Sequence, residues 1–258
     1  MLNFRNTLIV FSIALAGIAV TDVFKPVSAW LYIGIVLAVI SLLTWGSIRI
    51  QADFYLRSVC SGDRNIKAVS LTFDDGPDGL VTPMVLDILK ENKVKATFFI
   101  VGSKAEKHPE ILERIDREGH IIGGHSYTHH FFFDLLSSRR MKLEMKHTAE
   151  VIFNITGKKI RLFRPPYGVT NPTVARVVKD LKLISVGWSL RSKDTMIEDD
   201  SVLLKRIQNS LKPGDVLLMH DSKARTVNRL KALIKYLQDQ RYTVAEIDQL
   251  LNIEPYVR

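Results

Sequence analysis

Two neighbouring aspartates are the first residues of this 258-residue chain that could do chemistry. Asp74 and Asp75 follow a short apolar run and precede a Gly-Pro turn, which can bend both carboxylates into one pocket. One carboxylate could then hold a metal ion while the other acts as a base. Taken alone, the Asp-Asp-Gly-Pro sequence is equally typical of a turn or a helix cap.

A histidine pair follows about fifty residues later. His125 and His129 are four positions apart, and on a helical turn residues at this spacing share a face, so both imidazoles could bind one ion. Together with Asp75 they make a set of two histidines and one carboxylate, which leaves coordination positions open for water and substrate. We therefore predict a catalytic metal site at these three residues. The nearby His120 and His130 are interpreted as structural or surface residues.

Two other residues have types that suit a hydrolytic site. Arg164 precedes two prolines that stiffen its loop, so its guanidinium could hold a carboxylate in a bidentate pair. His220 closes a buried apolar run and could donate a proton to a leaving group. The competing interpretations are a surface arginine before a proline turn and a core histidine with a satisfied hydrogen bond.

The elements that must position these residues alternate between strand and helix. Strands are expected at residues 68–73, 96–101, 120–123, 160–163, 183–189, 215–220 and 242–245, and helices at 83–91, 109–118, 137–153, 172–181, 201–211 and 223–238. Repeated strand–helix units predict parallel strands with helical crossovers, in a closed or nearly closed β/α barrel or, alternatively, a doubly wound open sheet. Ligands bind at the carboxyl ends of such strands, and the residues expected there are Asp74, Asp75, His125, His129, Arg164, Asp194 and His220.

The first 50 residues have the composition of a membrane anchor. Residues 26–48 carry no charge and have Trp30 and Trp45 near their ends, as interfacial anchors often do. Residues 6–21 are also uncharged but short for a hydrocarbon core, and a signal peptide is the competing interpretation. We predict one or two transmembrane helices, at about 7–23 and 27–47, and a protein integral to the cell (inner) membrane.

The side of the membrane that the catalytic part faces stays open. With two spans, the positions of Arg5, Arg49 and Arg57 put both chain ends in the cytoplasm by the positive-inside rule. With one span, or with a cleaved first segment, the domain faces outward. The net charge of +9 favours contact with anionic lipid or an acidic substrate. No nucleic-acid-binding module is recognisable, and we expect no nucleic-acid partner.

Four motifs in order resemble the polysaccharide deacetylase family, also called the NodB-homology domain or carbohydrate esterase family 4. They are Thr72-Phe-Asp-Asp-Gly-Pro77, His125-Ser-Tyr-Thr-His129, Arg164-Pro-Pro-Tyr167 and Leu218-Met-His220. The similarity runs from about residue 67 to about residue 247. It implies a distorted (β/α) barrel of about seven strands, with an anchor at 1–50, a linker at 51–66 and the deacetylase domain at 67–258.

The resemblance also implies roles for the individual residues. Asp74 would be the general base, Arg164 would orient it, the backbone N–H of Tyr167 would help bind the oxyanion, and His220 would be the general acid. The metal ligands would be Asp75, His125 and His129, holding a divalent ion, Zn²⁺ in the first place, with Co²⁺, Ni²⁺ or Mn²⁺ as alternatives. Asp194 would support the catalytic histidine, but Thr195 stands where the family usually has Trp, so one wall of the substrate groove is expected to differ.

The implied activity is a metal-dependent hydrolysis of the N-acyl (N-acetyl) amide of an amino sugar in a polysaccharide or glycan. One alternative is a deacylase or deformylase that acts on a polyprenyl-phosphate-linked amino sugar at the membrane. A second is a non-catalytic carbohydrate-binding relic of the same fold, and a third is a hydrolase of a non-sugar amide. Residues 131–133, three phenylalanines close to His129, are expected to form either an apolar rim that meets lipid or an acyl chain, or a buried aromatic cluster.

Overall fold

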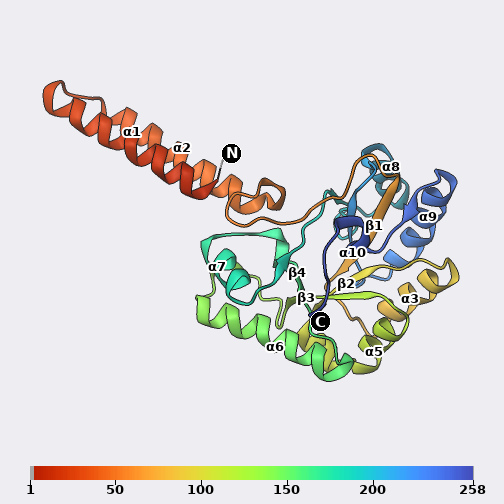
Figure 1. Cartoon of the computed structure of the whole chain (residues 1–258). Helices are drawn as coiled ribbons and strands as arrows, with labels where there is room; N and C mark the ends of the chain where they lie inside the picture. The colour runs from red at the N-terminus through yellow and green to blue at the C-terminus, as the bar shows by residue number, and fades with distance from the viewer. Residues whose placement is uncertain (1–2, 258) are drawn as a thin grey trace.

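The computed structural model describes residues 3–257 of the chain. Residues 1–2, at the start of the predicted anchor, and residue 258, at the end of the predicted deacetylase domain, lie outside the described residues. Figure 1 shows a pair of N-terminal helices that projects from one side of an α/β domain.

The projecting pair consists of α1 (Phe4–Phe24) and α2 (Ala29–Ile48). The two helices run side by side (Figure 1), and few of their side chains are buried. Both are long and apolar enough to cross a membrane, although a signal sequence would have the same properties as α1. The helices predicted at about 7–23 and 27–47 are therefore present, while their insertion into a membrane stays a prediction.

A parallel sheet forms the centre of the domain. Its strands are β1 (Ala68–Asp74), β2 (Thr97–Val101), β3 (Ile121–Ser126), β4 (Leu162–Phe163), β5 (Ile184–Ser185), β6 (Leu190–Arg191), β7 (Val216–His220) and β8 (Thr243–Val244). The order across the sheet is β5-β4-β3-β2-β1-β7-β6, and β8 pairs with the beginning of β1. All seven residues of β1 are buried, as expected for a central parallel strand that is covered on both faces.

The two edge strands of this order, β5 and β6, are neighbours in the chain. Only residues 186–189 separate them, and the five residue steps from Ser185 to Leu190 span at most about 18 Å. A flat sheet of seven strands would hold its edges roughly 29 Å apart, because neighbouring strands lie about 4.8 Å apart. The sheet must therefore curl until its edges approach each other. The fold is the distorted (β/α) barrel predicted from the sequence, and the doubly wound open sheet is excluded.

Helices surround the curled sheet (Figure 1). They are α3 (Val81–Glu91), α4 (Gly102–Lys107), α5 (Pro109–Arg117), α6 (Ser138–Thr156), α7 (Pro172–Asp180), α8 (Asp200–Ser210), α9 (Thr226–Asp239) and α10 (Ile247–Leu251), with 3₁₀ turns η1 (Ile50–Ala52), η2 (Phe133–Leu135) and η3 (Pro166–Gly168). Ser137 caps α6, since its side chain accepts a hydrogen bond from the Arg140 N–H. The helix ends at Gly157, whose φ of 71° is a left-handed conformation that glycine adopts without strain.

Some sequence-based assignments of strands and helices were wrong. The apolar run at 183–189 was predicted as one strand, but it contains only β5, and the chain then crosses to the opposite edge of the sheet before β6. The pattern of apolar residues could not reveal this crossing, because residues 186 and 188 are buried in the gap between the edges. The six-residue helix α4 was not predicted, since its sequence is too short and too polar to show a helical period.

The segment that follows α2 packs against the domain. Ile50 is buried in a core cluster together with Val186 and Trp188. Val59 forms a parallel bridge with Val186, and the Ser58 hydroxyl lies 2.7 Å from that of Ser185. The chain between the projecting helices and β1 therefore fills the space where the two edges of the sheet approach.

Candidate metal centre and catalytic groups

The parallel sheet brings polar residues from several strands to one edge. Asp74 ends β1 in register with His220, which ends β7. His125 belongs to β3, and Arg164 directly follows β4. The structure therefore gathers at the carboxyl edge of the sheet the residues that the sequence placed at strand ends.

Three of the predicted site residues form a compact set of metal donors. One ligand atom each from Asp75, His125 and His129 lies within 4.8 Å of the other two. The Asp75 Oδ1 atom is 3.1 Å from Nε2 of His129 and 3.6 Å from Nε2 of His125. Ligand atoms about 2.0–2.1 Å from a tetrahedral zinc ion lie roughly 3.3 Å apart, so these spacings suit such an ion.

Hydrogen bonds orient both imidazoles. The His125 Nδ1 atom lies 2.7 Å from the carbonyl oxygen of Arg164. A carbonyl oxygen only accepts, so Nδ1 carries the proton and Nε2 is left to coordinate a metal. The backbone N–H of His129 donates to the Ser126 hydroxyl, and the Tyr167 hydroxyl lies 3.4 Å from the His129 ring.

The spacing of the histidine pair suggested a helical turn, but the two residues do not lie on a helix. His125 is part of β3, and His129 belongs to the turn that follows. The backbone reaches this arrangement through left-handed conformations, with φ values of 104° at Ser126, 50° at His129 and 74° at Asp75. Such conformations cost of order 1–3 kcal/mol each and persist where the surrounding structure holds them in place. Three such conformations lie within or beside the donor set.

Charges around Asp75 favour its ionised form. Burial alone would raise the pKa of Asp75, but His125 and His129, followed by His220 and Lys104, hold the pKa below its ordinary value. Burial is also the main reason why the pKa of His129 is lowered. An ionised carboxylate and a neutral imidazole are the forms that bind a metal ion, so the chemistry of the donor set fits a divalent cation.

Asp74 is held by a buried arginine. One nitrogen of Arg164, Nη1, donates to Asp74 Oδ1 at 2.7 Å and to the Thr72 hydroxyl at 2.8 Å. The other guanidinium nitrogens donate to the carbonyl oxygens of Val186 and Gly187. Arg164 is fully buried and Asp74 nearly so. The predicted surface-arginine alternative is therefore excluded, and the arginine fixes the position of the carboxylate.

His220 is held by a buried aspartate. The His220 Nδ1 atom is 2.8 Å from Asp194 Oδ1, and the His220 backbone N–H donates to Asp194 Oδ2 at 2.8 Å. Burial alone would lower the pKa of His220, but the hydrogen bond and charge of Asp194, with the charges of Asp74 and Asp75, raise the pKa above its ordinary value. The histidine is thus oriented with Nε2 left for other contacts and is more readily protonated than a histidine in water.

One cavity of about 310 Å³ is lined by Asp74, Asp75, His125, His129 and His220. Arg164 and Asp194 are not among its lining residues. Tyr167 stands at its rim with a half-exposed side chain and a left-handed backbone at φ 59°. Trp188, Arg191 and Thr195 form part of the wall. The sequence had not indicated Trp188 or Arg191, although Trp188 supplies an aromatic wall residue close to Thr195.

The two spare histidines lie outside the donor set. His120 is buried, its Nδ1 accepts a hydrogen bond from the Ala96 N–H, and burial lowers its pKa to about 4. His130 is exposed, and its Nδ1 accepts from the Phe132 N–H. These contacts agree with the structural and surface roles expected from the sequence.

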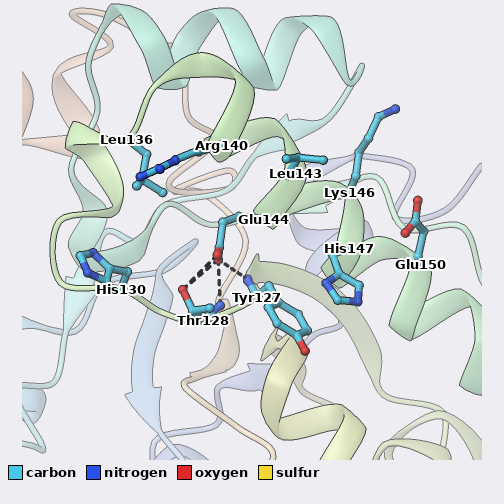
Figure 2. A pocket seen from close by; sticks show the side chains of 10 residues that line it. All are labelled: Tyr127, Thr128, His130, Leu136, Arg140, Leu143, Glu144, Lys146, His147 and Glu150. Carbon is cyan, nitrogen blue, oxygen red and sulfur yellow. Dashed lines mark hydrogen bonds between the residues drawn. The ribbon is translucent and has the colours of Figure 1, made fainter.

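A glutamate that the sequence did not single out braces the turn between His125 and His129. Figure 2 shows Glu144 of α6 in a second, larger hollow of about 940 Å³, where its carboxylate meets this turn. It accepts hydrogen bonds from the backbone N–H of Tyr127 at 3.1 Å and from the N–H and hydroxyl of Thr128. The sequence of α6 contains many charged residues, as expected for a helix with one face in solvent, so nothing in the sequence distinguishes Glu144.

The removal of this brace is expected to loosen the metal site. Glu144→Ala should raise the dissociation constant for Zn²⁺ by about 10–100-fold, because partners that orient metal ligands typically have effects of this size. Isothermal titration of the metal-stripped chain with Zn²⁺ measures the change. Glu150→Ala is the matched control, since Glu150 is on the same helix and lines the same hollow. Equal dissociation constants in the two variants would show that Glu144 has no part in ordering the turn.

The fold and the site place this chain among curled parallel α/β barrels that carry two histidines and an aspartate at their carboxyl edge. Comparisons with known proteins identify its family. Residues 61–186 match the family described as polysaccharide deacetylase. The peptidoglycan-N-acetylmuramic acid deacetylase PdaA of Bacillus subtilis is 34% identical over 202 residues, which cover 77% of this chain and 74% of that protein. The chain therefore belongs to the polysaccharide deacetylase family.

Other similar proteins agree with this assignment. The peptidoglycan-N-acetylglucosamine deacetylase PgdA of Listeria monocytogenes is 35% identical over 184 residues, but this chain spans only about two fifths of its length. A solved structure of a peptidoglycan N-acetylglucosamine deacetylase has a TM-score of 0.72 at 30% identity and covers 76% of this chain and 93% of that one. A pseudoenzyme of carbohydrate esterase family 4 from Bacillus anthracis also has this fold, with a TM-score of 0.69 at 31% identity over 74% of this chain and 68% of that one.

Proposed function

We propose that the chain is a divalent-metal-dependent hydrolase that removes the N-acetyl group from an amino sugar in a glycan. The observation that carries this proposal is that two groups able to transfer protons lie beside one set of metal donors. Each of these two groups is held in place by a buried partner of opposite charge or by a hydrogen bond. Asp74, fixed by Arg164, and His220, fixed by Asp194, both line the cavity that contains the three metal donors. Hydrolysis of an amide needs one group to take a proton from water and another to give a proton to the departing amine.

Asp75, His125 and His129 would hold the metal ion, and Zn²⁺ is the first choice for this donor set, with Co²⁺, Ni²⁺ or Mn²⁺ as alternatives. A bound divalent ion supplies Lewis acidity toward the amide carbonyl and lowers the pKa of water. With only three protein donors, coordination positions remain for water and the amide carbonyl, as a catalytic rather than a structural metal site requires.

The remaining groups divide the proton transfers between them. Asp74 takes a proton from the attacking water, and the hydrogen bond from Arg164 holds the Asp74 carboxylate in one position. The backbone N–H of Tyr167 donates to the oxygen that becomes negative as the amide is attacked. His220, oriented by Asp194, gives its proton to the nitrogen of the amino sugar, which then leaves as an amine.

The proposed substrate is an N-acetylated amino sugar, either in a glycan such as peptidoglycan or carried by a lipid at the membrane. Relatives with about one third identical residues are named peptidoglycan deacetylases for N-acetylglucosamine or N-acetylmuramic acid. A shared fold does not by itself give activity, as the pseudoenzyme among the similar structures illustrates. The supported acid–base pair and the complete donor set favour catalysis over a non-catalytic sugar-binding role. We also propose that α1 and α2 both span the cell membrane, so that the domain works beside the bilayer.

Metal removal tests this proposal directly. The purified chain should release acetate from N-acetylchitooligosaccharides or peptidoglycan fragments, lose this activity to the background rate after treatment with a chelator, and regain it on addition of Zn²⁺. His129→Ala should bind less than one equivalent of metal and lack turnover, whereas the adjacent His130→Ala should retain both. Acetate release that persists in metal-free protein, or a purified chain that binds metal but acts on neither substrate, would contradict the proposal.

A further inference from the structure

The three consecutive phenylalanines near the metal centre have opposite environments. Phe133 is 1% exposed and packs near Phe163 in a core cluster, whereas Phe131 and Phe132 are 68% and 54% exposed. Leu135, in the same short segment, is 72% exposed. We refer to Phe131, Phe132 and Leu135 as the aromatic rim. A contiguous group of large apolar side chains on the surface commonly marks a place where another apolar surface binds.

The aromatic rim belongs to the mouth of the proposed catalytic cavity. The ring of Phe131 lies 5.6 Å from the ring of Tyr167 and 4.9 Å from that of Phe132. Tyr167 in turn contacts His129, with 4.9 Å between the ring centroids. Whatever covers the rim therefore lies directly beside the entrance that a substrate must use.

Hydrogen bonds connect the rim to the end of α2. The Asn171 side chain donates to the Asp134 carbonyl oxygen at 2.6 Å, which ties the rim segment to the loop that carries Tyr167. The preceding residue, Thr170, is tied to Ser47 of α2 by two hydrogen bonds. Its N–H donates to the Ser47 carbonyl oxygen at 2.9 Å, and the Ser47 hydroxyl donates to the Thr170 carbonyl oxygen at 2.6 Å. The last turn of α2, the catalytic loop and the rim segment thus form one connected unit.

The helical pair is also fixed to the core and does not hang on a flexible tether. Ile50 is buried beside Trp188, and the Gln51 side chain donates to the Trp188 carbonyl oxygen at 2.8 Å. Figure 1 shows α7 and the start of α6 on the side of the domain nearest the helical pair, and in the chain the rim segment directly precedes α6 and the catalytic loop directly precedes α7. A bilayer crossed by α1 and α2 would therefore have this side of the domain against it.

Composition around the rim suits the interface of a bilayer. Aromatic side chains favour the boundary between headgroups and acyl chains. Arg139 and Arg140 follow the rim in the sequence and are exposed, and among residues 3–257 neither takes part in a salt bridge. Exposed cations beside an apolar rim are attracted to anionic lipid headgroups.

We propose that the aromatic rim is a second membrane-contacting surface, which enters the interface of the bilayer that α1 and α2 cross and holds the mouth of the cavity against it. The inference rests on the proposed function in so far as α1 and α2 span the membrane. Its consequence is that the amino sugar is presented at the bilayer surface, carried by an apolar anchor within the membrane.

The lipid contact can be measured without turnover. In the full-length chain with Cys60→Ser, a single cysteine is introduced by Phe132→Cys, labelled with an NBD fluorophore and reconstituted in bilayers of phosphatidylcholine and phosphatidylglycerol. We expect NBD emission at a shorter wavelength than in water and strong quenching by nitroxide-labelled lipid. Phe153→Cys is the matched control, because Phe153 is also an exposed phenylalanine, at the far end of α6. Equal quenching at the two sites overturns the proposal, and so does a blue shift without quenching by lipid, which would indicate a second protein copy on the rim.

A second measurement connects the contact to the substrate. Phe132→Ser combined with Leu135→Ser should lower kcat/KM for a lipid-anchored N-acetylglucosamine in these bilayers by about tenfold relative to kcat/KM for a soluble chitooligosaccharide, mainly through KM. An unchanged ratio would overturn the role of the rim in substrate access. If the unaltered chain turns over neither substrate, the proposed function fails, whereas the fluorescence result still decides whether the rim meets lipid.

Discussion

Asp74→Asn is expected to lower kcat for acetate release by about 10²–10⁴-fold, the range that a positioned general base contributes. The asparagine keeps an oxygen that can accept the hydrogen bond now made by Arg164 Nη1, so the side chain should stay in place while its basicity is lost. Asp74 is not among the three metal donors, and metal content should therefore remain near that of the unaltered chain. Steady-state kinetics with a metal-loaded sample measures the effect.

The control for this variant concerns its stability. The loss of the Asp74 charge leaves Arg164 buried without its carboxylate, and breaking a buried ion pair typically costs about 3–5 kcal/mol. Thermal unfolding and metal analysis must therefore accompany the kinetics, so that a folded, metal-loaded but slow variant is distinguished from an unfolded one. Near-normal kcat in Asp74→Asn would remove Asp74 from the role of base.

His220→Ala should have an effect of similar size, about 10²–10⁴-fold in kcat, because it removes the proposed acid for the departing amine. A second variant, at Asp194 beside His220, separates acid catalysis from packing. A general acid works only when protonated, so the rate should fall as the pH rises through the pKa of His220. This pKa is raised above its ordinary value of 6.5 in part by Asp194.

Asp194→Asn removes the charge and keeps an acceptor for His220 Nδ1. The pKa of His220 should fall, and the alkaline limb of the kcat profile should move to lower pH than in the unaltered chain. The comparison is made between samples loaded with the same metal ion, since that ion acts on both profiles alike. If the alkaline limb stays at the same pH or moves upward, His220 is not the acid whose protonation controls the rate.

The sequence was a good guide to the barrel and to the residues at its carboxyl edge. Strands at the predicted places put Asp74, His125, Arg164 and His220 together, because parallel strands share one direction and their ends must meet. The motif spacing also predicted that Asp75 would join the histidine pair. The donor atoms do lie together, although the backbone reaches this arrangement by a strained turn and not by a helix.

Other features depend on contacts between distant segments, which one sequence does not reveal. Glu144 is fifteen residues beyond His129 and reaches the metal-binding turn only because α6 packs beside β3. The opposite environments of Phe132 and Phe133 depend on which ring meets the core formed with α7, and hydrophobicity alone is the same for both. The separation of β5 from β6 depends on the curvature of the whole sheet.

The curled sheet leaves a gap between its two edge strands, β5 and β6. The way this gap is filled determines where the chain can be truncated. Residues 186–189 pass from one edge of the sheet to the other, and Ile50 and Val59 close the gap beside them. The carbonyl oxygens of Val186 and Gly187 accept hydrogen bonds from Arg164. A fragment designed for expression without its apolar helices should therefore begin before Ile50, because a fragment that begins at residue 67 lacks the segment that packs beside the partners of Arg164.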